Sequence, residues 1–194
     1  MNTKSFYDSI RRTLFSGSIS SAQFQGLEAI ITEYQRLCIS DLRKLAYILA
    51  TAYHETAKTM QPIAEYGKGK GRDYGKKLKM SRKPYTTPDK LYYGRGHVQL
   101  TWYENYANMG KLLGVDLLNN PELALTMDVS VKILFEGMLK GKSSFGDFTG
   151  KSLEHYFTPD KTDPLNARKI INGMDAAERI KGYYDLFYGA LILQ

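Results

Sequence analysis

The sequence predicts a mainly α-helical fold with a small irregular or β element, and three observations lead to this prediction. Apolar residues recur at helical spacing in several long segments. One stretch between these segments, rich in Gly, Lys and Arg, has no regular period. The 194 residues, 43% of them hydrophobic, can bury a core without a metal or a disulfide, so residues 1–194 are expected to form a single domain.

Two helices are expected in the N-terminal third of the chain. One covers roughly residues 21–36, and the other follows Ser40, a suitable N-cap with Asp41 in the first turn behind it. The second helix carries an apolar stripe formed by Leu42, Leu45, Ala46, Leu49, Ala52 and Tyr53. Glu55 lies at the border of this stripe, where a carboxylate can face a cleft.

Residues 67–88 are predicted to form a mobile loop or a short hairpin, because Gly and Pro interrupt every regular pattern there. Within this segment, residues 68–83 hold eight Lys or Arg and one Asp, a balance equal to the formal net charge of +7 of the whole chain. A basic patch attracts polyanions. We therefore expect this segment to contact anionic polymers of a cell envelope or lipopolysaccharide.

Further helices are expected at residues 102–114, 121–140 and 164–191, with Pro121 near the first turn of the second of these and Gly141 after its end. No internal repeat or sustained heptad is present, so a monomer is expected. The longest apolar runs stay below the 18 residues of a membrane-spanning helix, and no integral membrane segment is expected.

The first residues and the cysteine content indicate where the protein is made. Residues 1–8 lack the apolar region of a signal peptide, which predicts synthesis in the cytoplasm. Cys38 is the only cysteine, so an intramolecular disulfide is excluded. Its apolar neighbours predict a buried thiol.

Two glutamates offer the chemistry of glycoside hydrolysis. Glu55 ends the second helix, and Glu65 follows ten residues later in a loop. Cleavage of a glycosidic bond needs one protonated carboxyl group and one carboxylate on the opposite side of the bond. A zinc site at His54 lacks a second histidine at the required spacing, so neither a metal nor a cofactor is expected.

Residues 91–106 combine Tyr and Trp with amide and hydroxyl side chains. Gln99, Thr101 and Asn105 are separated by even numbers of residues, which predicts that they share one face of an extended strand. Amide and hydroxyl groups can both donate and accept hydrogen bonds, as the hydroxyls of a sugar require. This segment is therefore expected to bind a glycan.

Residues 92–102, YYGRGHVQLTW, closely resemble the YYGRGPxQLSW motif of glycoside hydrolase family 19, the chitinase-like enzymes of the lysozyme superfamily that include many phage endolysins. Three segments agree with the family in order, namely the helix end at 52–56, GVDLLNNPELA at 114–124 and IING at 170–173. The resemblance implies a lysozyme-like α+β fold with a cleft between helical lobes.

The resemblance also implies roles for single residues. Glu55 would be the general acid, and Thr101 would hold the attacking water together with a second carboxylate. We expect Glu65 to be that carboxylate, with Asp73 in reserve. The residues expected to bind the sugar chain are Gln99, Asn105, Asn172 and Tyr93.

Three positions depart from the family pattern. His97 replaces a proline, and Met174 replaces the second glycine of the INGG segment. Ala176 stands where plant-type members keep an acidic residue paired with a buried arginine, which Arg179 matches here. Asp175 is the available substitute for that acidic partner, and Arg179 is expected to support the catalytic carboxylates.

These features predict an inverting endolysin that cleaves the β-1,4 bond between N-acetylmuramic acid and N-acetylglucosamine in peptidoglycan. It would be made in the host cytoplasm and act on the cell wall after holin-dependent release. A chitinase and an inactive cell-wall-binding module are alternatives. A nucleic-acid-binding module that stacks bases on Tyr74 and Tyr85 is a further alternative, but it leaves Glu55 without a role, so no nucleic acid partner is expected.

Overall fold

The computed structural model describes residues 2–141 and 148–193 of the chain. The α-helices in these ranges are α1 (Thr3–Thr13), α2 (Ser21–Arg36), α3 (Leu42–Glu55), α4 (Tyr103–Leu113), α5 (Met127–Met138) and α6 (Ala177–Leu191). Short 3-10 helices are η1 (Asp73–Lys76), η2 (Pro121–Leu125), η3 (Leu153–His155) and η4 (Asn166–Ile170). The strands are β1 (Ile63–Ala64), β2 (Arg95–Gly96), β3 (Phe157–Thr158) and β4 (Lys161–Thr162). The predicted mainly helical fold is confirmed.

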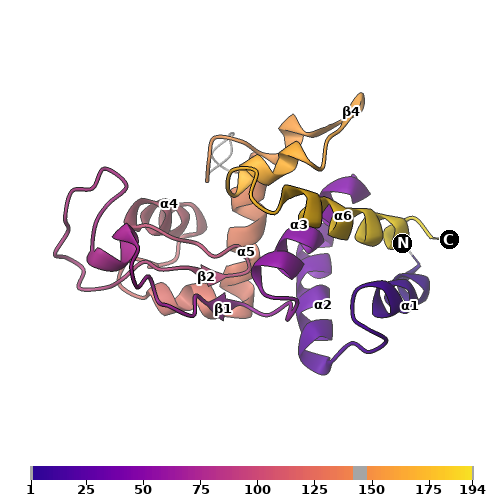
Figure 1. Cartoon of the computed structure of the whole chain (residues 1–194), viewed down its shortest axis with the longest axis horizontal. Helices are drawn as coiled ribbons and strands as arrows, with labels where there is room; N and C mark the ends of the chain where they lie inside the picture. The colour runs from indigo at the N-terminus through magenta and orange to yellow at the C-terminus, as the bar shows by residue number, and fades with distance from the viewer. Residues whose placement is uncertain (1, 142–147, 194) are drawn as a thin grey trace.

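Two groups of elements lie side by side in Figure 1. The helical lobe contains α1, α2, α3 and α6, with α3 packed along α6. The hairpin lobe contains β1, β2, η1, η2 and α4. Helix α5 contacts α2 and α3 of the helical lobe as well as α4 and η2 of the hairpin lobe, so it joins the two.

Helix α3 is more deeply buried than its sequence predicts. Every residue from Leu45 to Tyr53 is buried, because α2, α5 and α6 cover it on several sides. The predicted single apolar stripe was therefore too narrow, and small residues such as Ala50 fill the other faces. The helix also begins one residue later than predicted, since the carboxylate of Asp41, and not Ser40, accepts the backbone N–H of Arg43.

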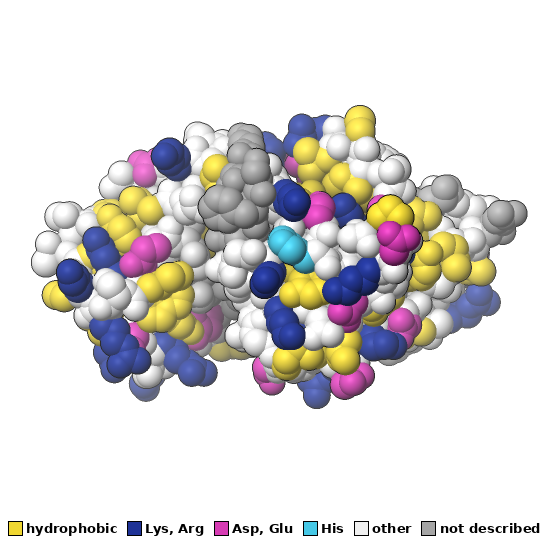
Figure 2. All heavy atoms as spheres, turned by 90° about the horizontal axis from the view of Figure 1, so that it is seen from above, with side chains coloured by type: hydrophobic (Ala, Val, Ile, Leu, Met, Phe, Trp, Pro, Cys, Tyr) yellow, Lys and Arg dark blue, Asp and Glu magenta, His cyan; other side chains and the backbone are white. Residues whose placement is uncertain are grey.

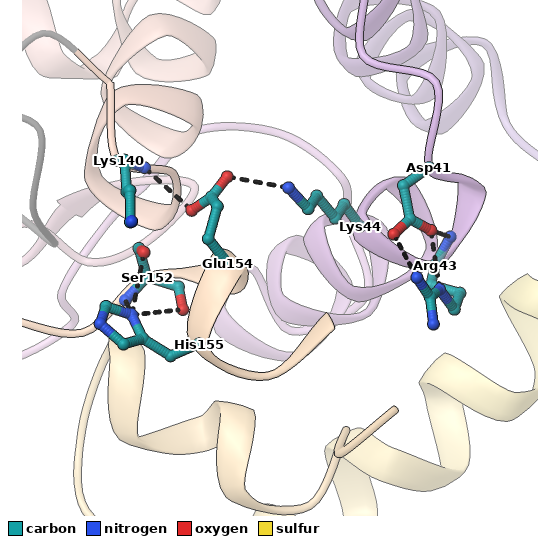
Figure 3. A network of polar contacts seen from close by, with 7 residues as sticks. All are labelled: Asp41, Arg43, Lys44, Lys140, Ser152, Glu154 and His155. Atoms are coloured by element: carbon teal, nitrogen blue, oxygen red, sulfur yellow. Dashed lines mark hydrogen bonds and ion pairs between the residues drawn. The ribbon is translucent and has the colours of Figure 1, made fainter. Parts of the chain in front are cut away.

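Polar contacts fix the N-terminal end of α3 to the C-terminal half of the chain (Figure 3). Lys44 Nζ donates to Glu154 Oε1 at 2.9 Å, and Glu154 Oε2 accepts the backbone N–H of Lys140 at 3.1 Å. Arg43 bonds Asp41 and also donates to Thr162 in β4 at 2.8 Å. These contacts fix the N-terminal end of α3, and Glu55 is the last residue at the opposite end of the same helix.

The strands form a compact turn and not the extended segment that the sequence predicts. β1 pairs antiparallel with β2, and after a turn at residues 97–99 Leu100 pairs back with Arg95. Gln99 takes a φ of +52° in this turn, and Asn105 lies in α4. The prediction that Gln99, Thr101 and Asn105 share one strand face is therefore wrong.

The segment at residues 67–88 contains the predicted short hairpin. Leu78 pairs with Pro84, and Tyr85 donates its backbone N–H to Lys77, while η1 precedes this hairpin. Figure 2 shows Lys and Arg side chains gathered at the left-hand end of the molecule, where Figure 1 draws this segment.

Two predicted helices are interrupted, and one predicted burial is wrong. The segment 121–140 divides at Thr126 into η2 and α5, and 164–191 divides into η4 and α6, with Ala176 at a φ of +56° before α6. Cys38 is exposed, because it lies in the turn between α2 and α3 with a φ of +52°. None of the helices in residues 2–141 and 148–193 has the length and apolar character that a membrane crossing needs.

Candidate functional site

A groove of about 480 Å³ lies between the two lobes, as the predicted cleft requires. Its walls come from the end of α3, the 72–80 segment, residues 98–105 and η4 with the residues that follow it. The polar and aromatic side chains on these walls are Glu55, Arg72, Tyr74, Gln99, Thr101, Trp102, Asn105, Phe148, Arg168 and Asn172. The fold thus brings together Glu55 and four of the polar residues predicted from the sequence.

Glu55 is the last residue of α3 and pairs with an arginine that the sequence analysis does not identify. Arg168 Nη1 donates to Glu55 Oε1 at 2.6 Å, and the two side chains are only 4% and 14% exposed, respectively. Arg168 Nε donates to the backbone oxygen of Asp175 at 2.9 Å. The arginine therefore fixes the Glu55 carboxylate relative to the loop between η4 and α6.

Arg179 is not the buried arginine that the resemblance implies. It is exposed on α6, and Arg168 occupies the position beside the carboxylate. Arg179 still acts on the site at longer range through His54. Burial is the main cause of the lowered pKa of His54; Glu55 opposes this lowering, while Arg168 and Arg179 add to it.

Glu65 stands directly behind the groove wall. Its Oε1 accepts the hydroxyl of Tyr74 at 3.1 Å, and its Oε2 accepts the backbone N–H of Gly94 at 3.1 Å. Tyr74 lines the groove, and burial together with the charge of Glu65 raises the pKa of this phenol, so it remains a hydrogen-bond donor. Asp73, the reserve, pairs with Lys76 at 3.4 Å and Arg82 at 3.6 Å.

The amide and hydroxyl residues of the groove differ in how much of their hydrogen-bonding capacity is free. Gln99 Nε2 donates to the backbone oxygens of Ile63 at 3.0 Å and Gly96 at 3.2 Å, so this amide also fixes the turn. Thr101 and Asn105 line the groove without a side-chain hydrogen bond to another described residue. Their side chains are available to a ligand.

Asn172 and Tyr93 differ in their relation to the groove. Asn172 is exposed on the groove wall, with Oδ1 accepting the N–H of Gly173 at 2.9 Å. Tyr93 does not line the groove but a different cavity, and the Arg95 guanidinium lies 3.6 Å from its ring centroid. The structure therefore separates Tyr93 from the other residues that were expected to bind sugar.

His97, the residue in place of the family proline, is fully buried and bridges three parts of the chain. Its Nε2 lies 3.2 Å from the backbone oxygen of Met60, which accepts only from a protonated nitrogen, so Nδ1 accepts the Ser130 hydroxyl at 2.7 Å. The backbone N–H of His97 donates to the same hydroxyl at 2.8 Å. Burial lowers the pKa of His97 to about 4, so the bridge is neutral.

Within the part of the chain that the structure describes, no three His, Cys, Asp or Glu residues are placed to hold a metal ion. Arg168 was missed because an arginine between Ala167 and Lys169 carries no motif of its own, although its position four residues before Asn172 is a usable signal.

A family model described as chitinase class I matches residues 37–140, more than half of the chain. Endochitinase 1 of Gossypium hirsutum is 35% identical over 102 residues, which cover 50% of this chain and 26% of that protein. Inactive chitinase-like protein 1 of Hevea brasiliensis is 59% identical over 39 residues, 20% of this chain and 12% of that protein. The chain thus spans about a quarter or less of these relatives.

Two solved structures match nearly the whole chain. A bacterial family 19 chitinase has a TM-score of 0.61 at 23% sequence identity, with 98% of this chain and 94% of that chain covered. The class IV chitinase from Zea mays has a TM-score of 0.62 at 18% identity, with 96% and 92% covered. At these identities the likeness establishes the fold.

Proposed function

This chain belongs to the chitinase class I family, glycoside hydrolase family 19, and on that premise we propose that it hydrolyses β-1,4 glycosidic bonds in polymers that contain N-acetylglucosamine. The observation that carries the proposal is the groove. A carboxylate paired with a buried arginine lies there among hydroxyl and amide side chains, of which Thr101 and Asn105 bond no other described residue. This is the arrangement that a glycan-cleaving site needs.

The proposed reaction is a single displacement with inversion. Glu55 donates a proton to the leaving oxygen, while a water held by Thr101 attacks the anomeric carbon from the opposite face. Glu65 takes the proton of that water through the Tyr74 hydroxyl, which lines the groove and donates to Glu65 Oε1 at 3.1 Å. Gln99, Asn105 and Asn172 bind the sugar hydroxyl and N-acetyl groups.

The pair between Glu55 and Arg168 adds a step to this mechanism. Arg168 Nη1 holds Glu55 Oε1 at 2.6 Å, whereas the general acid must direct its proton to the leaving oxygen at the moment of cleavage. We propose that the bound sugar chain separates the pair, so that the carboxyl group of Glu55 turns to the leaving oxygen only in the occupied groove. Arg168 would then act as a positioning residue for the carboxylate.

Two polymers fit the proposed bond specificity. The names of the relatives favour chitin-type polymers of N-acetylglucosamine. One feature of this chain favours peptidoglycan instead, namely the basic segment at residues 68–83, because a cationic surface is attracted to an anionic bacterial wall and gains nothing from neutral chitin. Under the peptidoglycan proposal the protein acts as a phage endolysin, made in the host cytoplasm and released to the wall.

The decisive experiment compares wild type with Glu55→Gln on purified peptidoglycan sacculi and on chitin hexamer, with new reducing ends identified by mass spectrometry. We expect the wild type to cleave at least one polymer and Glu55→Gln to lose about 100-fold or more of that activity. Glu28→Gln, which retains an acceptor for its partner Tyr7, is the matched control.

Each outcome of this experiment has a distinct meaning. Reducing-end muramic acid from sacculi would support the muramidase, and cleavage of the hexamer alone would support the chitinase. Equal activity of Glu55→Gln and wild type would remove Glu55 from the mechanism. Binding to sacculi with no cleavage of either polymer would favour an inactive wall-binding protein.

A further inference from the structure

A second cavity of about 1030 Å³ lies on the other side of the wall that holds Glu65. Consecutive residues of η1 separate the two spaces, since Tyr74 lines the groove and Gly75 lines the second cavity. The remaining lining comes from two further segments, residues 89–95 and 119–126. A ligand that extends sideways from the groove would therefore meet this cavity across a single chain segment.

Two of the stretches that resemble the family meet at this cavity and not at the groove. Tyr93 and Arg95 come from the 92–102 stretch, and Asn120 and Glu122 come from the 114–124 stretch. The groove accounts for Gln99 and Thr101, but it gives these four residues no role. The second cavity is where their side chains converge.

The cavity presents charges of both signs. Lys90 is exposed on its rim and forms no ion pair with another described residue, whereas Lys77 pairs with Asp89. The guanidinium of Arg95, 3% exposed, pairs with Glu122 only through Oε1, and the Glu122 side chain is 64% exposed. An ammonium group and one free carboxylate oxygen are thus open to a ligand.

These features fit a charged peptide better than a neutral sugar. Sugar sites typically offer an open aromatic face, but Tyr93 is 7% exposed and Arg95 lies 3.6 Å from its ring centroid. Lys90 suits a carboxylate, Glu122 suits an ammonium group, and Asn120 offers an amide for a peptide bond. A peptide with both charge types matches all three side chains.

We propose that the second cavity binds the short peptide that branches from each muramic acid residue of peptidoglycan, with a peptide carboxylate on Lys90 and a peptide ammonium on Glu122. This inference rests on the proposed action on peptidoglycan. A five-residue peptide spans up to about 17 Å when extended, and the two spaces that it would connect are lined by the consecutive residues Tyr74 and Gly75.

The test uses the charge reversal Lys90→Glu on three substrates, namely intact sacculi, glycan strands stripped of their peptides by an amidase, and chitin hexamer. We expect a loss of about threefold to tenfold in kcat/KM on intact sacculi, with less than twofold change on stripped strands and hexamer. Lys4→Glu, at an exposed residue of α1 in the helical lobe, controls for the change in net charge.

Titration of the wild type with a synthetic peptide of L-alanine, D-glutamate and a diamino acid provides the second readout. Saturable binding that Lys90→Glu weakens would support the inference. Equal losses for Lys90→Glu on intact and stripped strands, or no peptide binding, would overturn it while leaving peptidoglycan hydrolysis intact. If the wild type cleaves neither peptidoglycan substrate, the peptidoglycan proposal itself fails and this inference fails with it.

Discussion

Among the described residues, Arg168 is the cation that pairs with Glu55, and it fixes the position of this carboxylate. Arg168 is nearly inaccessible to solvent, and its Nε already donates a hydrogen bond to the backbone oxygen of Asp175. Removing one member of a buried pair leaves the other charge without compensation, which is costly even where the pair itself adds little stability.

Arg168→Met is expected to lower the free energy of unfolding by about 3 kcal/mol, because Glu55 loses its partner. It should also lower kcat by about tenfold, because the carboxyl group of Glu55 is no longer held in position. Urea unfolding and steady-state kinetics measure both effects. Arg36→Met, which breaks the pair between an exposed arginine and Glu33, is the control, and a wild-type kcat in Arg168→Met would exclude the proposed role of the pair.

Thr101 offers a hydroxyl to the groove and bonds no other described residue with it, so its substitution should affect the reaction more than the fold. We expect Thr101→Val to reduce kcat by about tenfold to 100-fold with a similar melting temperature, because the attacking water loses its anchor. Thr101→Ser should recover most of the rate. Equal rates for the Val and Ser variants would show that the hydroxyl is not used.

Among the elements, the contact between the β2 turn, α5 and the chain after α3 depends on one neutral histidine. His97 bonds Ser130 of α5 and the carbonyl oxygen of Met60, and the same carbonyl faces Gly26 of α2, where an added Cβ would lie only 1.8 Å from it. This arrangement fixes the turn after β2, in the hairpin lobe, against α5 and against the Met60 carbonyl that packs on α2.

The neutral histidine predicts a stability loss in mild acid. The pKa of His97 is about 4 in the folded protein and about 6.5 in the unfolded chain, so below pH 6.5 only the unfolded chain gains the proton. The contribution of neutral His97 to the free energy of unfolding is therefore fully present above pH 6.5. The free energy of unfolding should fall by about 3 kcal/mol as the pH decreases to 4. Urea midpoints across this range measure the loss.

His97→Gln is the informative variant for this prediction, because its slope of stability against pH should be flatter than that of the wild type. Other titrating groups contribute equally to both proteins. His155→Gln serves as the control at a partly exposed histidine. A wild-type slope that His97→Gln leaves unchanged would rule out His97 as the cause.

Helix positions follow from the sequence here, whereas breaks and turns do not. The spacing of apolar residues places α2 and α3 to within a residue or two, because burial sets that spacing. The breaks at Thr126 and at residues 171–176 depend on tertiary packing, as does the positive φ of Gln99 that ends the expected strand. Such local conformations are stabilised by partners that are distant in the sequence.

The site could be predicted in part for a similar reason. Motif positions identify Glu55, Gln99, Thr101, Asn105 and Asn172, all of which line the groove. Arg168 and Tyr74 line the groove from segments without a recognised pattern. Tyr93 belongs to the strongest motif but lines the second cavity instead. A motif fixes which residues are near one another in the chain, but the turn at residues 97–99 decides which cavity each one faces.

For the molecule as a whole, the positive net charge can be assigned to one segment of the chain. Residues 68–83 supply a balance equal to the net charge of +7, and Figure 2 shows Lys and Arg side chains at the left-hand end, where Figure 1 draws this segment. Attraction between such a surface and an anionic wall acts over a distance set by salt, about 10 Å at 0.1 M ionic strength.

Replacing Lys68, Lys70 and Lys83 together by Gln should weaken binding to sacculi by about tenfold at low salt, because none of the three forms an ion pair with another described residue. The difference should vanish at about 0.5 M salt, and hydrolysis of chitin hexamer should not change. Sedimentation of protein with sacculi measures the binding. A control triple variant at Lys4, Lys111 and Lys151 should retain affinity, and an equal loss in the control would assign the effect to net charge alone.

The exposed thiol of Cys38 gives the protein a single natural attachment point for a probe. It lies in the turn before α3, whereas Glu55 ends that helix, so about 20 Å of helix separates the two. A maleimide-linked fluorophore would therefore mark every molecule once, at a known position remote from the groove. Its anisotropy would report how the rotation of the protein slows when sacculi are added, without any change to the residues that line the groove.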